Sequence, residues 1–276
     1  MKRSVCYDTV IKSVTRYRGK EINILRDKKM ETKVTFIYDY QNIELPEPLV
    51  KVFLPELDAF VELQCQVLAQ SKSKIELAEG EAHVLTDDMV KEEGLPGIET
   101  VEAYKAAIQA EVPRVIISEQ THMILMNYLM PQLVERSTFE INDEEATEES
   151  EKRLQVFEEN AQEKGMTVEE FGQKEFGAPT MDEGAIRQYV LQLGRTQFLF
   201  RVLAQEYLKR QGQVYDLASY AGYVKELSEV SSMPEEQVRE LVPLHLYIEE
   251  VPALVMLDEM SAWVEPQVSF TSEEES

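Results

Sequence analysis

Three histidines and two cysteines are the first residues in this chain that could do chemistry. His83, His122 and His245 carry the only imidazole groups, and Cys6 and Cys65 carry the only thiols. Histidines scattered this widely predict neither a proton relay nor a metal centre. Two cysteines cannot build a disulfide framework or a cysteine-rich zinc site. We therefore expect these five residues to serve packing or to lie on the surface.

Clusters of carboxylates are the second candidate for chemistry. They gather between Asp143 and Glu151 and again at Glu158 and Glu159. The clusters lack the spacing and the turn glycine of a calcium-binding loop, so we expect a solvated helix face. The sequence also contains no glycine-rich phosphate loop, nucleophile elbow, zinc-protease motif or CxxC pair. The expectation is a protein that is not an enzyme and that uses no metal or other cofactor.

Apolar side chains that surround two helical segments are a more unusual feature. A helix that is apolar all round must be buried or must bind something apolar. Methionine is favoured on surfaces that accept varied partners, because its thioether side chain is flexible and polarizable. The pattern leaves two interpretations open, an ordinary core and a surface that binds other polypeptides. The candidate binding residues are Met123, Met126, Met130, Phe198, Phe200 and Tyr207.

The charge of the chain excludes several classes of partner. With 28 Lys and Arg against 52 Asp and Glu, the formal net charge is −24. Nucleic acids and anionic membranes attract clustered positive charge, so we expect neither as a partner. Residues 1–40 hold ten basic against five acidic residues, which places the negative charge on the remainder of the chain. No segment approaches the roughly 20 apolar residues of a membrane span, and we expect a cytoplasmic protein.

The elements that would position these residues change character along the chain. Alternating apolar residues at 34–40 and 61–67 predict strands, so residues 1–85 are expected to form a small β-rich, antiparallel domain. The remainder, residues 86–270, carries helical periodicity. The acidic tail, residues 271–276, is expected to be disordered. The predicted fold class is therefore mainly α with a small N-terminal antiparallel β unit.

Two long helices are predicted in the second part. Thr86 is expected to cap a short helix, and Thr100 to cap a long one that runs to about Arg136 with a kink or break at Pro113. A second long helix is predicted from about Asp182 to Gln211. Each long helix is followed by an extended link, a helix, a methionine and another helix. This repeated order predicts two helical hairpins, or arms, on one body, although two generic helix-turn-helix stretches explain it as well.

Several segments resemble a known chaperone family. Leu85–Lys91 and Thr100–Lys105 are similar to the entry and first long helix of the C-terminal, substrate-binding region of the bacterial chaperone trigger factor (trigger factor/SurA-like chaperones). Met166–Phe171 resembles its middle part and Met233–Val238 its closing arm, in the same order over about 200 residues. The resemblance implies an elongated helical body with two arms that hold unfolded or nascent polypeptides by apolar contact, without ATP.

Two family features have no counterpart in this sequence. The first 85 residues are too short for an intact FKBP-like isomerase domain, and only Tyr17–Lys20 is reminiscent of the ribosome-docking loop. The acidity also weighs against docking to the ribosome. The expected function is therefore an ATP-independent holdase. The alternatives are a degenerate peptidyl-prolyl isomerase and a dedicated partner-binding or assembly protein, including one whose partner is a second copy in a homodimer.

Overall fold

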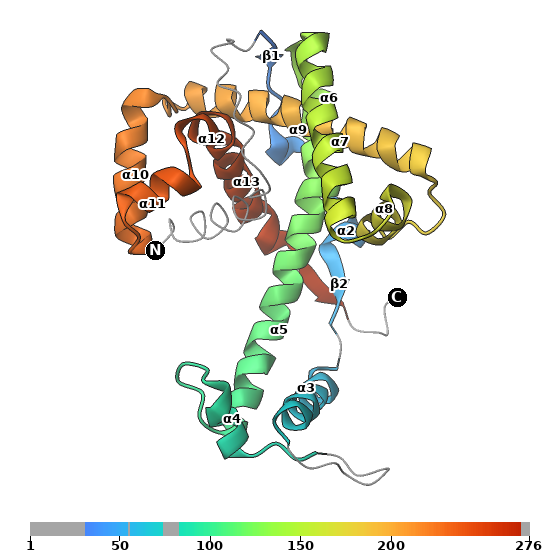
Figure 1. The fold of residues 1–276 in the computed structure, drawn as a ribbon, viewed down its shortest axis with the longest axis vertical. Coiled ribbons are helices and arrows are strands. Elements are labelled where there is room, and N and C mark those ends of the chain that lie inside the picture. Colours follow the sequence, from blue (N-terminus) through green and yellow to red (C-terminus); the bar gives the residue numbers. More distant parts are fainter. Residues whose placement is uncertain (1–30, 55, 74–82, 272–276) are drawn as a thin grey trace. The chain divides into compact units, whose positions relative to one another are not determined.

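The computed structural model of the 276-residue chain describes residues 31–54, 56–73 and 83–271 (Figure 1). This part of the chain is mainly helical. It also contains one antiparallel and one parallel pair of short strands. The predicted fold class, mainly α with a small antiparallel β unit near the N-terminus, is confirmed.

The chain divides into two compact units. Unit 1 draws on the residues up to Ile43 and on Met126–Met260, and unit 2 comprises Glu44–Leu125 and Ser261–Ser276. The predicted domain boundary at residue 85 does not appear in this division. The physical reason is a shared core in unit 2, where residues before and after position 85 pack together.

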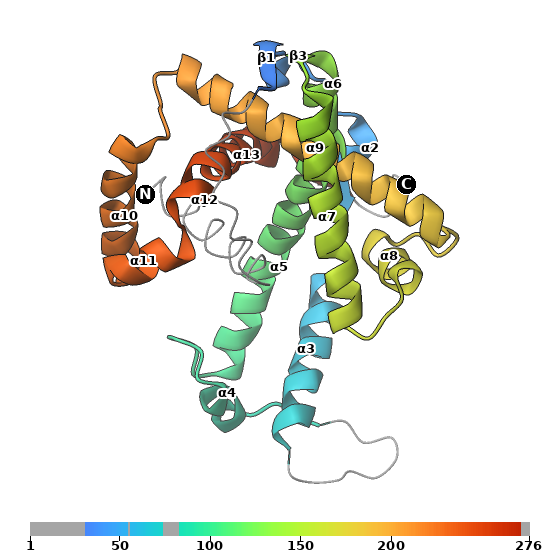
Figure 2. The same cartoon turned by 45° about the horizontal axis from the view of Figure 1, so that its top comes forward.

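Unit 1 is built around a pair of crossing helices, α7 and α9, visible in Figure 2. Its elements are β1 (Lys33–Phe36), η1 (Tyr40–Asn42), α6 (Met130–Arg136), β3 (Thr138–Glu140), α7 (Asp143–Glu163), α8 (Val168–Phe176), α9 (Glu183–Arg210), α10 (Leu217–Ser231), α11 (Glu235–Leu241), α12 (Leu244–Glu249) and most of α13 (Val251–Val264). The predicted order of long helix, link, helix and helix is observed twice along the chain: first as the helical path Val101–Arg136, β3, α7 and α8, and then as α9, a link, α10 and α11.

The antiparallel strands β1 and β3 are held beside the start of α7. Val34 lies opposite Phe139, and the register shifts between Val34 and Phe36. The buried carboxylate of Glu145 accepts hydrogen bonds from the backbone N–H groups of Glu31 (2.8 Å) and Thr32 (2.9 Å). This arrangement satisfies a buried charge with two donors. Strand β1 is shorter than the predicted one, because the chain turns into η1 at Tyr40.

The contact between α7 and α9 depends on a residue without a side chain. A Cβ added at Gly194 of α9 would lie 3.0 Å from the Cα of Ser150 and from the Cβ of Arg153, both in α7. This glycine therefore lets the two backbones approach closely. Helix α9 begins at the cap Asp182, whose side chain accepts a hydrogen bond from Ala185 N (2.8 Å), so the predicted long helix is confirmed.

Unit 2 is a helical pair with short flanking elements. These are α2 (Glu47–Val50), β2 (Lys51–Phe53), α3 (Leu57–Lys72), α4 (Asp87–Glu93), α5 (Val101–Ile124), η3 (Glu265–Gln267) and β4 (Ser269–Thr271). Helix α3 lies alongside α5, with α4 near one end of the pair (Figure 2). Strand β2 pairs in parallel with β4, and the predicted acidic tail beyond Thr271 lies outside the described residues.

The prediction of a strand at 61–67 is wrong, since these residues belong to α3. Val61 and Cys65 are buried in the core of unit 2 with Leu68. Leu63 and Val67, by contrast, are exposed. The alternation of apolar and polar residues arose from a helix that carries apolar side chains on two opposite faces.

The helix caps predicted from the sequence are observed. Thr86 accepts a hydrogen bond from Met89 N (3.4 Å), and Thr100 accepts one from Ala103 N (3.1 Å). Helix α5 continues through Pro113, so the break considered there does not occur. The helical path to Arg136 is confirmed, although it includes a π-helical segment, η2 (Leu125–Leu129).

The π-helical segment precedes a second proline. Pro131 lies in the first turn of α6 and has no N–H group to donate. In an α-helix a proline ring clashes with the carbonyl group four residues earlier, and a π-helical turn changes the hydrogen-bonding pattern at that place. The division into units falls at this segment, between Leu125 and Met126.

Candidate functional site

The six predicted binding residues fall into three groups by burial. Met130, Phe198 and Phe200 are buried in the core of unit 1. Met126 and Tyr207 are partly buried, and Met123 of unit 2 is 53% exposed. The three buried side chains stabilise the fold and offer no surface to a partner in this structure. Within unit 1, the accessible part of the predicted set is reduced to Met126 and Tyr207.

Helix α9 is apolar on all sides of its central part because that part is buried. Buried residues occur on every side of its central part, from Phe198 to Ala204. Strand β1, α6 and α7 all pack against this helix. Of the two interpretations that the sequence left open, the structure therefore supports the core for this stretch.

Tyr207 is held by polar and aromatic neighbours. Its hydroxyl donates to Oε2 of Glu259 (3.2 Å), and its ring meets that of Tyr40 edge to face at 6.4 Å. Burial raises the pKa of Tyr207, and the nearby Tyr40 and Glu259 raise it further. The phenol is therefore a neutral donor in a structural contact.

A pocket of about 130 Å³ is lined by residues of α7, α8 and α9. These three helices meet at one end of unit 1 (Figure 1). The size of the pocket is close to that of an apolar cavity that accepts one benzene molecule. Six apolar and three polar side chains line it, and they expose polar and apolar surface in about equal measure. The lining residues are Arg153, Val156, Phe157, Asn160, Phe171, Glu175, Phe176, Val190 and Leu193. We call this the α7–α9 pocket.

Aromatic rings form much of the pocket wall. Phe157 stacks on Phe176 with centroids 5.5 Å apart and an interplanar angle of 7°. Phe157 also contacts Phe171 at 4.8 Å, and Tyr189 meets Phe176 edge to face at 4.8 Å. Such pairs stabilise a cluster beyond the burial of area alone. The pocket therefore has walls that are fixed by ring packing.

The cap of α8 positions two of these rings. Thr167 accepts a hydrogen bond from Glu170 N (3.1 Å), and the Glu170 carboxylate accepts one from Thr167 N (2.9 Å). This reciprocal capping box starts the helix that carries Phe171 and Phe176. Backbone hydrogen bonding at the cap lowers the pKa of Glu170, which keeps it ionised.

Charged groups of both signs lie near the pocket. The ammonium of Lys164 lies 4.6 Å from the centroid of the Phe171 ring and 3.3 Å from Glu175 Oε1. Arg153 and Asn160 contribute further donors to the lining. The arrangement can bind an apolar side chain and hydrogen-bond to the backbone that carries it.

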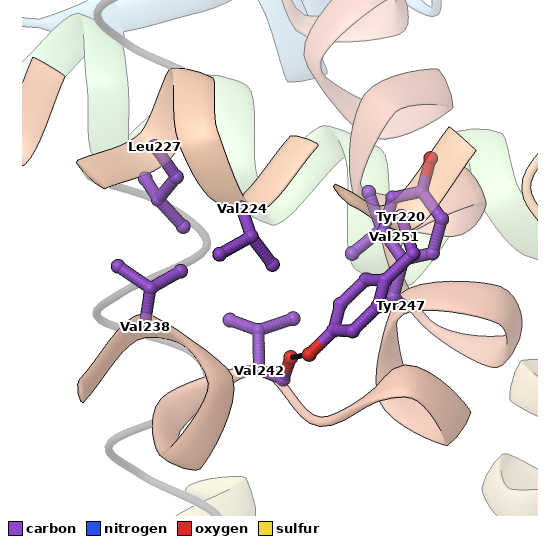
Figure 3. Packing of buried hydrophobic residues seen from close by; sticks show 7 residues of the cluster. All are labelled: Tyr220, Val224, Leu227, Val238, Val242, Tyr247 and Val251. Atoms are coloured by element: carbon purple, nitrogen blue, oxygen red, sulfur yellow. Dashed lines mark hydrogen bonds between the residues drawn. The ribbon is translucent and has the colours of Figure 1, made fainter. Parts of the chain in front are cut away.

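Helices α10 to α13 of unit 1 share a core, shown in Figure 3. We call α10, α11 and the residues that lead into them the second hairpin. Val224 of α10 and Val238 of α11 are buried there, and the Tyr220 hydroxyl donates to the carbonyl of Val242 (2.7 Å). At the start of α10, Leu217 is 71% exposed and Val214 is also exposed. The hairpin thus combines a packed interior with apolar side chains that reach solvent.

A cluster of ionised side chains joins α7 and α9 to the residue between α12 and α13. Arg201 of α9 forms ion pairs with Glu149 of α7 and with Glu250, between α12 and α13. Burial alone would lower the pKa of Arg201, but the two carboxylates raise it overall. Arg201 in turn lowers the pKa of Glu149 against the effect of burial. These groups are a structural network with no nucleophile among them.

Metal ligands do not gather in the part of the chain that the structure describes. Among residues 31–54, 56–73 and 83–271, no three His, Cys, Asp or Glu side chains are placed to hold a metal ion. In the same ranges, no helix combines the length and the apolar run needed to cross a bilayer. Cys65 is a free, buried thiol whose pKa is raised by burial.

Comparison with known proteins adds no assignment. No family model matches this chain, and no curated protein is significantly similar to it.

The α7–α9 pocket was not predicted from the sequence. The sequence signal for this pocket is the presence of a few aromatic residues on otherwise polar helices. These residues are Phe157 in the acidic α7, and Phe171 and Phe176 in α8. Aromatic residues on a helix of that polarity must either pack on a neighbour or form a binding surface. The structure shows that they do the first and border a pocket in doing so.

Proposed function

We propose that this protein is an ATP-independent holdase that binds unfolded or nascent polypeptides in the cytoplasm, as its resemblance to trigger factor implies. The observation that carries the proposal is the α7–α9 pocket. A concave, aromatic-walled pocket that can take one large apolar side chain is suited to segments that are buried once a client has folded. Unfolded chains expose such side chains singly and in any sequence context.

The surroundings of the pocket support reversible binding. Asn160 and Arg153 can donate hydrogen bonds to backbone carbonyls of any client, which makes recognition independent of client sequence. The exposed apolar residues of the second hairpin, Val214 and Leu217, provide further contact area. The net charge of −24 keeps a protein with exposed apolar groups from associating nonspecifically.

The proposal is tested by the aggregation of an unfolded model protein, measured by light scattering at equimolar ratio. We expect the wild-type protein to suppress aggregation and to bind an apolar dye more strongly than a compact control protein. If it does neither, the proposal that the protein is a holdase is wrong.

A filled pocket tests the site itself. Val156 is half-buried in the pocket wall, so Val156→Trp should occupy the pocket and weaken suppression severalfold. Val230→Trp, at an exposed position in α10, is the matched control and should retain wild-type suppression. Equal suppression by both variants would remove the pocket from the mechanism and leave the holdase activity to other apolar residues.

A further inference from the structure

The first part of the chain has a charge opposite to that of the whole protein. Residues 1–30, which precede the described part of the chain, hold nine Lys and Arg against three Asp and Glu, whereas the whole chain carries −24. The positive charge is concentrated around one aromatic residue. Residues 12–20 contain four basic residues and no acidic one, with Tyr17 directly between Arg16 and Arg18.

The α7–α9 pocket lies in acidic surroundings. Between its first and last lining residues, Arg153 and Leu193, the chain carries eight acidic and four basic residues. One of these acidic residues, Glu175, is exposed in the lining, and Glu163 is exposed one turn beyond the lining residue Asn160. Opposite charges attract, so the pocket favours an aromatic side chain that has cations beside it.

The basic segment is attached close enough to reach the pocket. It leads into Glu31, whose backbone N–H donates to Glu145 in the first turn of α7 (2.8 Å). The lining residue Val156 follows Glu145 by eleven positions, about 17 Å at the rise of an α-helix. Tyr17 precedes Glu31 by fourteen positions, and an extended chain of that length spans about 46–50 Å. Tyr17 can therefore reach the pocket even by a path around α7.

A tyrosine side chain suits the lining of the pocket. The volume of about 130 Å³ is close to that of a cavity that accepts one benzene molecule, and much of the wall consists of aromatic rings. The side chains of Asn160 and Glu175 can accept a hydrogen bond from a phenol. The other aromatic residue of the segment, Tyr7, is followed by Asp8 and lacks cations on both sides.

We propose that Tyr17 occupies the α7–α9 pocket of its own chain and so competes with clients for it. This regulation rests on the proposed function, in which the pocket binds apolar side chains of unfolded polypeptides. A short tether holds Tyr17 at an effective concentration on the order of 1 mM. A contact with a dissociation constant of about 1 mM is then closed half of the time, and a client that offers several side chains displaces it.

Tryptic cleavage after Arg16 and Arg18 in the full chain tests this contact without any client. Docking of Tyr17 hides both bonds, so cleavage follows the population in which the segment is released. Val156→Trp fills the pocket and leaves the cleavage sites unchanged. We expect it to raise the initial cleavage rates, followed by mass spectrometry, about twofold or more. Val230→Trp, at an exposed position in α10, is the matched control and should be cleaved like the wild type.

Glu175→Lys tests the charge of the pocket without filling it. The Glu175 side chain is 44% exposed and pairs with Lys164, so the substitution costs the fold little and keeps the test valid if Val156→Trp does not fold. A lysine there repels the two arginines, and cleavage should again rise about twofold or more at about 50 mM NaCl. Glu229→Lys is the matched control, because Glu229 is also exposed and pairs with a lysine one turn away.

The cleavage rates decide whether the contact exists. Equal rates in the wild type and in both pocket variants would show that Tyr17 is not held in the pocket. An equal increase in the control variants would assign the protection to something other than the pocket. Protection that grows with protein concentration would place Tyr17 in the pocket of a second copy. Each of these results would overturn the proposal.

The aggregation assay decides whether the contact regulates client binding. Tyr17→Ser should suppress aggregation at about half the concentration that the wild type requires, whereas Tyr7→Ser should behave like the wild type. If the wild type suppresses aggregation and Tyr17→Ser does so no better, the competition with clients is refuted. If neither protein suppresses aggregation, the holdase proposal is wrong, and the cleavage rates still decide whether Tyr17 occupies the pocket.

Discussion

A Cβ added to Gly172 of α8 would lie 2.5 Å from Cγ2 of Ile186 in α9, a side chain that is fully buried. The two helices therefore meet with no room for a methyl group. Gly172→Ala gains about 1 kcal/mol of helix propensity but overpacks the contact at a cost of about 1–3 kcal/mol. We expect a net loss of about 1 kcal/mol in the free energy of unfolding, measured by urea titration.

Gly222 in α10 is the matched control for that substitution. A Cβ at this position meets nothing within 4 Å. Gly222→Ala should therefore stabilise the protein by about 0.5–1 kcal/mol, because it lowers the backbone entropy of the unfolded chain. If both alanine variants changed stability in the same direction, the tight contact between Gly172 and Ile186 would not be the cause.

Loss of Arg201 should be costly because its partners remain charged. Its side chain is 20% exposed and joins Glu149 and Glu250. Arg201→Met removes this cation from Glu250 and leaves Glu149 with Lys152 alone. We expect a loss of about 2 kcal/mol, below the value for a fully buried pair since Glu250 reaches solvent. Chemical denaturation measures this loss.

Two further variants check the origin of that loss. Adding Glu149→Gln to Arg201→Met should recover part of the stability, because it removes one of the two carboxylates that Arg201 no longer neutralises. Arg195→Met breaks a pair with Asp143, whose side chain is 85% exposed, and should cost about 0.5 kcal/mol or less. An equal cost for Arg195 and Arg201 would contradict a role for burial.

Asp258 in α13 should make stability fall as the pH rises. Burial raises the pKa of Asp258 above its ordinary value of 3.8. The folded state then binds the proton more tightly than the unfolded state, so stability decreases from about pH 4 up through the raised pKa. Asp258→Asn should be more stable than the wild type at about pH 7, and this advantage should vanish near about pH 3.

Glu170 provides a pH dependence of the opposite sign. Hydrogen bonds from Thr167 lower the pKa of Glu170, so its contribution is present above the ordinary pKa and is lost as the pH falls. Glu170→Gln should therefore be less stable than the wild type at about pH 7, with a difference that shrinks on acidification. Thermal melts at several pH values distinguish the two behaviours.

The predicted methionines should separate into structural and surface residues. Met130 is buried, and Met130→Ala should lower the free energy of unfolding by about 2–4 kcal/mol. Met123 is exposed, and Met123→Ala should change it by less than about 0.5 kcal/mol. Denaturant titrations provide both values. A large loss at Met123 would mean that its side chain packs in solution.

Local signals in the sequence predicted the helices well. The caps Thr86 and Thr100 were predictable because a hydroxyl beside a helical pattern satisfies free N–H groups, a requirement that involves only a few neighbouring residues. The strand at 61–67 was mispredicted for a related reason. An apolar residue at every second position fits a strand, but it also fits a helix with two apolar faces, and only the partner α5 decides between them.

Burial was harder to predict than helix position. Phe198 and Phe200 are residue types that also occur on binding surfaces. They are buried here because other parts of unit 1 cover α9 on several sides. The α7–α9 pocket depends on rings that are up to 19 residues apart in sequence. The burial of a side chain and the meeting of such rings both follow from tertiary packing. The periodicity of a single segment does not predict that packing.

The interleaved order of the two units has a consequence for synthesis on the ribosome. Strand β1 pairs with β3 about a hundred residues later, and β2 pairs with β4 near residue 270. The strand pair of each unit therefore forms only after residues far along the chain have been made. Contacts between distant residues also close long loops, which slows folding. Both units become complete only when nearly the whole chain has been made, so the nascent protein must itself pass through a long stage with unpaired apolar segments.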